Sequence, residues 1–138
     1  MNEPRWIGLD LVVALHSEQL EEHGGSEGIR DLAGVESALA KPRNLFAYER
    51  PSLFDLAAAY ASGLCQNHGF IDGNKRTSFL TAYVFLFDNG FEIIASQAEV
   101  VAAVLELTEH KLTQSQFAAW LAEHSQPLEA QQGAHVSV

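Results

Sequence analysis

The sequence predicts an all-α fold in a single domain, built around a central pair of buried helices. Along most of the 138 residues, apolar side chains recur every three or four positions, which is the period of an α-helix. Helix-capping residues and glycine stops divide these stretches into six predicted helices. No repeat or long linker interrupts the chain, and its length suits one domain of about 100–150 residues.

The first two predicted helices lie in the amino-terminal third of the chain. One runs roughly from Asp10 to His23 and ends at a pair of glycines, positions 24–25. The other has Asp31 as its N-cap and is expected to stop at Pro42, because proline breaks a helix interior.

The third and fourth predicted helices form the central pair. Ser52 and Asp55 predict a capped start for the third, which extends from Leu53 to about Asn67 and is apolar nearly all round. The fourth runs through Asp88, with Asn74 as its expected N-cap, and is also mostly apolar. A helix without a polar face is normally buried at the centre of a protein.

The last third of the chain holds two shorter helices. After a left-handed stop at Asn89-Gly90, residues 91–94 are expected to be extended. Two capping boxes then predict the fifth and sixth helices: Ser96 with Glu99, and Thr113 with Gln116. The domain is expected to span residues 1–124, followed by a flexible tail, 125–138, that is rich in Gln, Gly and Ser.

Composition narrows the class of protein. Eighteen acidic and eight basic side chains give a net charge of -10, which opposes direct binding to nucleic acid. The single cysteine, Cys65, lies in an apolar run and is interpreted as a small buried residue in a cytoplasmic protein. No signal peptide is recognisable, and the longest strongly apolar stretch, 79–87, is too short to span a membrane.

The connection between the two central helices concentrates polar side chains that suit phosphate chemistry. Gly73 permits unusual backbone angles and a close ligand approach. The helix that starts at Asn74 presents free N–H groups, which favour an anion, and Lys75 and Arg76 add positive charge. We therefore expect this helix start to bind phosphate.

Two further side chains complete a candidate active site. Asp72 stands beside the expected phosphates, where a carboxylate suits Mg²⁺. Histidine titrates near neutrality, so His68 can accept a proton from an incoming hydroxyl. Phe70 is expected to anchor the connection on the core.

Structural interpretations compete with each of these assignments. His68 can cap the preceding helix, Asp72-Gly73 can form an ordinary turn, and Lys75-Arg76 can be solvated surface charge. Their joint occurrence within nine residues favours function. His16 and His23, seven residues apart, are interpreted as surface positions, and no His-Glu-x-x-His string predicts a zinc site.

The string His68-x-Phe70-x-Asp72-Gly73-Asn74-Lys75-Arg76 resembles the motif of the Fic/Doc superfamily, and specifically its Doc (death-on-curing) branch. The resemblance extends from about Leu11 to Leu121 and includes Gly28-Ile29-Arg30-Asp31 and Asn89-Gly90-Phe91. It implies a Fic/Doc-type helical bundle whose active-site loop joins the two central helices. Gly69 stands where many relatives have proline, a departure that removes no reactive group.

The resemblance also implies a reaction. Family members that transfer AMP have glycine at the position of Lys75 and usually arginine at that of Phe79. The Doc branch shares the lysine and is thought to bind ATP reversed, so that the γ-phosphate passes to a threonine of elongation factor Tu and translation stops. By this resemblance His68 is the catalytic base and Asp72 the Mg²⁺ ligand, and four residues hold the phosphates: Gly73, Asn74, Lys75 and Arg76.

Regulation is expected to come from another protein. The self-inhibitory segment of many Fic proteins has no match here, since the nearest string, Ser125 with Glu129, is followed by Ala130. The resemblance implies a toxin held in check by a Phd-type antitoxin. Two alternatives stay open: an AMP transferase that tolerates Lys75, and a non-catalytic module that binds an antitoxin or a nucleotide.

Overall fold

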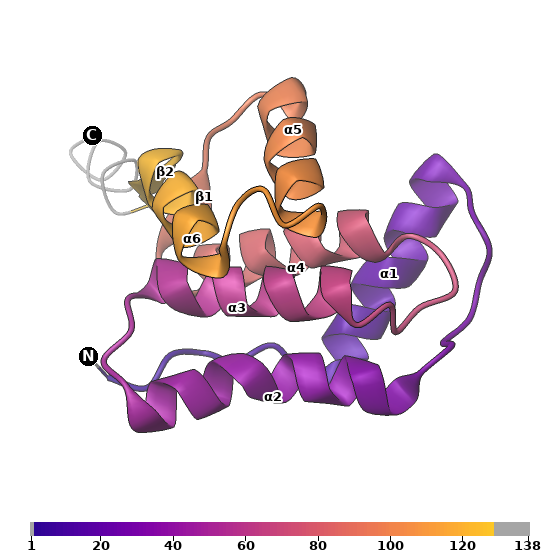
Figure 1. The fold of residues 1–138 in the computed structure, drawn as a ribbon, viewed down its shortest axis with the longest axis horizontal. Helices are drawn as coiled ribbons and strands as arrows, with labels where there is room; N and C mark the ends of the chain where they lie inside the picture. Colours follow the sequence, from indigo (N-terminus) through magenta and orange to yellow (C-terminus); the bar gives the residue numbers. More distant parts are fainter. Residues whose placement is uncertain (1, 129–138) are drawn as a thin grey trace, which may run out of the picture.

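The computed structural model describes residues 2–128 and confirms a mostly helical, single-domain fold. Within these residues, five helices pack around or beside a central one, α3, and a short two-stranded sheet lies at one end (Figure 1). The elements in chain order are α1 (Leu9–His23), α2 (Leu32–Tyr48), α3 (Leu53–Gln66), α4 (Asn74–Asp88), β1 (Phe91–Ile93), α5 (Gln97–Thr108), α6 (Gln114–Glu123) and β2 (Ser125–Pro127).

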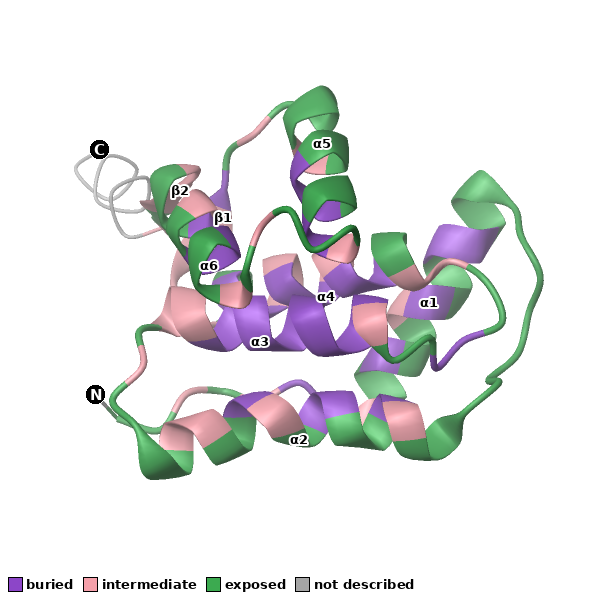
Figure 2. Cartoon of the chain, viewed as in Figure 1, coloured by how far each residue is buried: buried purple, intermediate pink, exposed green. Residues whose placement is uncertain are grey.

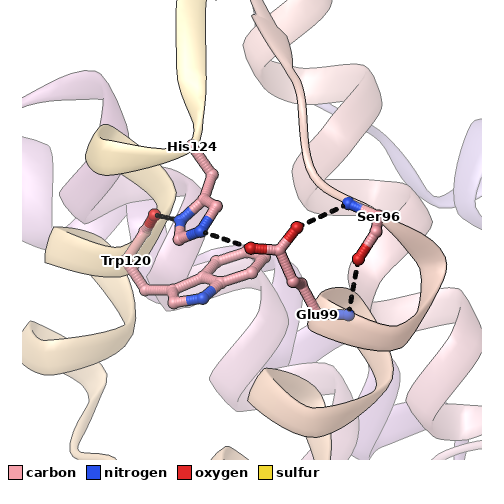
Figure 3. Close-up of polar contacts among 4 residues, drawn as sticks. All are labelled: Ser96, Glu99, Trp120 and His124. Atoms are coloured by element: carbon pink, nitrogen blue, oxygen red, sulfur yellow. Dashed lines mark hydrogen bonds and ion pairs between the residues drawn. The ribbon is translucent and has the colours of Figure 1, made fainter.

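Helix α3 is the central element, as its apolar sequence predicts. Every residue from Leu56 to Cys65 is buried, and the helix is covered by α2, α4 and α6 (Figures 1 and 2). The capping box at its start is present, because Ser52 Oγ accepts from Asp55 N and the Asp55 carboxylate accepts from Ser52 N. The capping boxes of α5 and α6 are also confirmed, and Figure 3 shows that of α5.

Helix α4 packs beside α3 but is less fully buried than its composition suggests. Its carboxyl-terminal half contributes Phe85 and Leu86 to the core, whereas Phe79 and Leu80 are half-buried and line a cleft. The core side of its first half carries small polar residues. Two of their hydroxyls are satisfied within the helix itself: Ser78 Oγ donates to Lys75 O at 2.7 Å and Thr81 Oγ1 to Thr77 O at 2.8 Å, whereas Thr77 Oγ1 has no partner among the described residues.

The expected stop of the second helix at Pro42 is wrong, because α2 continues to Tyr48. Pro42 is buried together with Val35, Ala38 and Leu39, at the spacing of a single helix face. This face packs against α3, where a Cβ on Gly63 would lie 3.0 Å from Ala38 Cα. Burial against α3 thus outweighs the loss of one helical hydrogen bond at the proline.

The first residues of the expected flexible tail belong to the folded domain instead. Residues Ser125–Pro127 form β2 and pair antiparallel with β1, with Glu92 opposite Gln126. Leu128 N extends this pairing by donating to Gly90 O at 2.9 Å. The two strands are far apart in the sequence, so no local pattern predicts their pairing. Residues 129–138 of the expected tail lie outside the described part of the chain.

Over residues 2–128, no helix combines the length and the apolar character needed to cross a membrane.

Candidate functional site

The connection between α3 and α4 is held firmly to the rest of the fold by Phe70. This residue is 2% exposed, and its ring stacks on that of His16 from α1, with centroids 3.8 Å apart. Phe70 also forms an isolated antiparallel bridge with Ile29. The predicted role of Phe70 as an anchor is therefore confirmed.

Backbone hydrogen bonds from the segment after α1 fix the other side of the connection. Arg30 N and Asp31 N both donate to Gly69 O, at 2.8 and 3.0 Å, and Ile71 N donates to Gly28 O at 3.0 Å. Asp31 also caps α2 by accepting from Gly34 N. One segment thus fixes both the start of α2 and the candidate loop.

Asn74 does not cap α4, contrary to expectation. Gly73 is the N-cap residue, and Asn74 is the first residue of the helix. The Asn74 side chain instead turns back to the loop, where its amide accepts from Phe70 N at 3.0 Å and donates to Phe70 O at 2.9 Å. An amide can make both bonds at once, so Asn74 closes the loop rather than the helix start.

The start of α4 is consequently open. Within residues 2–128 no side chain caps it, and the N–H groups of Asn74, Lys75 and Arg76 have no hydrogen-bond partner there. Such groups, together with the helix dipole, attract an anion. The structural property on which phosphate binding depends is present.

Gly73 is required at this position for two separate reasons. Its φ of 78° and ψ of 16° lie in the left-handed region, which costs residues with a Cβ about 1–2 kcal/mol. In addition, a Cβ on Gly73 would overlap with Nε2 of Gln19 and lie 3.0 Å from its Cδ. A side chain here would disturb α1 and narrow the space in front of α4.

Asp72 lies directly before the open helix start, with its carboxylate held by two backbone groups. Gly73 N donates to Oδ1 at 2.8 Å and Ser26 N donates to Oδ2 at 3.2 Å. A Cβ on Gly25 would lie 2.8 Å from Oδ2, so glycine leaves room for the carboxylate. Asp72 is exposed and lines the cleft, as a ligand for a cation requires.

The described residues contain no group of three or more His, Cys, Asp or Glu side chains placed to hold a metal ion. A lone carboxylate beside a phosphate site nevertheless fits Mg²⁺, which takes one or two protein carboxylates and completes its shell with phosphates and water.

A cleft of about 900 Å³ opens in front of α4 and brings all six predicted site residues together: His68, Asp72, Gly73, Asn74, Lys75 and Arg76. His68, Lys75 and Arg76 are exposed in it. His68 has a φ of 48°, an uncommon backbone conformation for a residue with a side chain. The imidazole is thus available to the cleft rather than packed in the core.

The walls of the cleft come from helices that the sequence did not associate with the site. Helix α1 contributes Gln19, Glu22 and His23, and α5 contributes an apolar wall. On that wall Val101 and Leu105 are exposed. Only the tertiary arrangement brings these two helices to the loop.

His16 is the clearest site residue that sequence reasoning missed. Its interpretation as a surface position is wrong, because it is 5% exposed. Its Nε2–H donates to Asp72 O at 2.7 Å, since a carbonyl oxygen can only accept. A usable signal was present: His16 lies on the same helical face as Val12, Gln19 and Leu20, the buried residues of α1.

Cys65 lies at the edge of the cleft but is buried. Burial raises the pKa of its thiol. A thiol with a raised pKa stays protonated and is a poor nucleophile. The geometry therefore supports its interpretation as a small buried residue.

Comparison with known proteins places this site in a family. The sequence model of the Fic/DOC family matches residues 6–86. A protein named "Protein kinase doc" from Escherichia phage P1 is 32% identical over 93 residues, which cover 67% of this chain and 74% of that protein. A protein named "Toxin Doc" from Mycolicibacterium smegmatis is 40% identical over 76 residues, which cover 52% of this chain and 57% of that protein. The matched region contains the loop, the open helix start and the helices beneath them, so the chain belongs to the Fic/DOC family.

Proposed function

We propose that this protein is a toxin kinase that transfers the γ-phosphate of ATP to a threonine of a cytoplasmic protein, with elongation factor Tu as the acceptor. The observation that carries the proposal is the uncapped start of α4, which opens into a cleft beside two cationic side chains. The names of the two relatives, a kinase and a toxin, point in the same direction. The choice of elongation factor Tu rests on the resemblance to the Doc branch.

The phosphates are bound by the first turn of α4. Gly73 leaves the space in which they approach the backbone, and the N–H groups of Asn74, Lys75 and Arg76 are free to donate. Lys75 and Arg76 also supply two positive charges. The Asn74 side chain is already bonded to Phe70, so its contribution is the backbone N–H and the shape of the loop.

His68 is the base in this scheme. It takes the proton of the threonine hydroxyl as that oxygen forms a bond to the γ-phosphorus. The bond between this phosphorus and the oxygen bridging it to the β-phosphate breaks, and ADP leaves. The exposed position of His68 on the cleft leaves room for a protein substrate to approach.

Asp72 would hold Mg²⁺, which neutralises phosphate charge when it is bound. The two backbone donors to the Asp72 carboxylate and the bond from His16 to its carbonyl keep the group in place. Positioning and charge neutralisation supply most of the catalysis in phosphoryl transfer, and these are what the loop residues provide.

Control of the toxin is assigned to a Phd-like antitoxin acting in trans. The name of the second relative supports the toxin assignment. The net charge of -10 fits a protein that leaves DNA binding to its partner.

Two labels on ATP test the reaction. The protein is incubated with Mg²⁺, elongation factor Tu and ATP labelled on either the γ- or the α-phosphate. We expect γ-label on the acceptor. Transfer of α-label would contradict the proposal and identify an AMP transferase.

The variant Lys75→Gly sharpens this test. Removing the lysine side chain reopens space at the helix start, so we expect γ-transfer to be abolished or replaced by α-transfer. Unchanged γ-transfer would contradict the role given to Lys75.

Growth of bacteria tests whether the protein is catalytic at all. We expect expression of the wild type without an antitoxin to arrest growth and expression of His68→Ala to be harmless. Equal harmlessness of the two proteins would favour the non-catalytic alternative.

A further inference from the structure

Gln19 of α1 carries a buried amide that no part of the proposed reaction uses. The residue is 2% exposed. Within the described chain, neither its Nε2 nor its Oε1 has a hydrogen-bond partner. Buried polar groups in folded proteins are partnered in the large majority of cases, so this amide requires an explanation.

The amide lies at the start of α4. Gln19 lines the same cleft as the phosphate-binding residues. There it lies against Gly73, where an added Cβ would overlap with Nε2. Gly73 is the residue from which the free N–H groups of α4 begin. Gln19 therefore reaches from a different helix to the point at which the proposed anion would bind.

The surroundings of Gln19 leave its donor for a ligand. The adjacent Asp72 carbonyl already accepts from His16, and both carboxylate oxygens of Asp72 accept backbone N–H groups. Both amide atoms are buried and lack partners among the described residues, so in either orientation of the amide an unpartnered donor lies beside Gly73. The amide N–H₂ is a neutral donor, so it can bind an anion without adding to the positive charge of Lys75 and Arg76.

We propose that Gln19 is a phosphate-contacting residue of this site, whose Nε2–H₂ donates to an oxygen of the phosphate bound at the start of α4. The inference rests on the proposed function, because that function supplies the phosphate. It extends the site from the loop motif to α1. It also gives Gly73 a second purpose, because a side chain at this position would separate the amide from the ligand.

The test is the affinity of Gln19→Met for the Mg²⁺ complex of adenylyl imidodiphosphate, a non-hydrolysable ATP analogue, measured by calorimetry. Methionine keeps the length of the side chain and removes both polar atoms. A hydrogen bond to a charged group is worth enough for its loss to weaken binding about tenfold or more. We expect the unfolding temperature to be unchanged or raised, because an unpartnered buried amide has been replaced by an apolar group.

The matched control is Gln114→Met on α6, outside the cleft, which should bind the analogue as the wild type does. If the wild type binds the analogue and Gln19→Met binds it with the same affinity, the role of Gln19 is overturned and the proposed function still stands. Absence of binding by the wild type would overturn the proposed function together with it.

A second measurement needs no variant and decides the question if Gln19→Met does not fold. The side-chain amide of Gln19 is assigned in the NMR spectrum of the wild type through its proximity to Gly73. We expect its proton and nitrogen signals to shift as the analogue is added. Signals that stay unchanged at saturation would contradict a direct contact.

Discussion

The start of α4 differs from the starts of three other helices in the described part of the chain. Helices α3, α5 and α6 each start with a reciprocal capping box in which both hydrogen bonds are present. In α5, Ser96 Oγ accepts from Glu99 N at 3.1 Å and the Glu99 carboxylate accepts from Ser96 N at 2.9 Å (Figure 3). Helix α4 starts at a left-handed glycine, and no side chain of residues 2–128 caps it.

Helix α1 also starts at a glycine, Gly8, without a side-chain cap from the described residues, but Gly8 does not line the cleft, so it is the combination of an uncapped start and the cleft that distinguishes α4. A cap satisfies N–H groups that would otherwise be free, and its loss costs about 1 kcal/mol. Helix α4 forgoes that contribution and depends on packing against α3 for its position. The same N–H groups are then free for a ligand. The open start therefore lowers the stability of the fold locally and leaves the N–H groups available for binding.

The substitution Gly73→Ala should produce the largest effect, because it closes the open start. The added Cβ would overlap with Gln19, and the alanine would have to adopt a left-handed backbone conformation. We expect γ-phosphate transfer to fall by about 100-fold or more, because small displacements at a reacting centre have effects of this size. Transfer to elongation factor Tu and the unfolding temperature are both measured.

Gly90→Ala is the control for backbone strain. Gly90 has a φ of 100° and no heavy atom within 4 Å of an added Cβ. The Gly90→Ala protein should have a lower unfolding temperature than the wild type but the same rate of phosphate transfer. An active Gly73→Ala protein would contradict the view that this helix start must stay open.

The substitution His16→Phe should have the next largest effect. Phenylalanine can keep the stacking on Phe70 but cannot donate to Asp72 O. We expect kcat to fall by roughly tenfold, since a displaced loop costs rate, and the free energy of unfolding to fall by about 1 kcal/mol.

His16→Gln, whose side-chain amide nitrogen can reach the position of the imidazole Nε2, should recover part of the kcat if the bond to Asp72 is what matters. Equal kcat values in His16→Phe and the wild type would show that the loop needs no support from α1.

At a capped start the opposite pattern is expected. Thr113→Ala removes the side-chain acceptor for Gln116 N at the start of α6. We expect the free energy of unfolding to fall by about 1 kcal/mol, measured by urea denaturation, with phosphate transfer unchanged. A loss of activity as large as that of His16→Phe would remove the distinction between the two kinds of start.

The smallest expected effect concerns the pH dependence of the capped start of α5. Hydrogen bonds from Ser96, with a smaller contribution from His124, hold the pKa of Glu99 below its usual range. The carboxylate therefore stabilises the fold above the ordinary pKa of glutamate, about 4.3. This contribution is lost as the pH falls through the lowered pKa of the folded protein.

Replacing Glu99 by Gln keeps an acceptor for Ser96 N but removes the titration. Between about pH 6 and about pH 3, the unfolding temperature of the wild type should fall slightly more than that of Glu99→Gln. Parallel curves would show that the cap does not depend on the charge of Glu99.

Features that depend on neighbouring residues were predictable from the sequence. The three capping boxes and the N-cap at Asp31 are short-range patterns, and they were confirmed at the expected residues. The anchoring role of Phe70 was also confirmed. The six candidate site residues lie within nine positions of each other, so their gathering in one cleft follows largely from the loop itself.

Features that depend on distant contacts were mispredicted or missed. Pro42 lies inside a helix because α3 packs against that face, and Ser125–Pro127 form a strand because β1 lies beside them. Asn74 was mispredicted for a local reason: it had the right residue type for a cap, but its side chain bonds to the N–H and the carbonyl of Phe70, only four residues earlier.

By itself, the sequence determined the helical fold, the segments that become helices and the loop that carries the reactive groups, because hydrophobic period and capping act over a few residues. Only the tertiary structure decided that α1 places His16 and Gln19 against this loop. The reason is physical: whether a polar group is buried, partnered or free depends on segments remote in the chain, and local patterns do not encode their arrival.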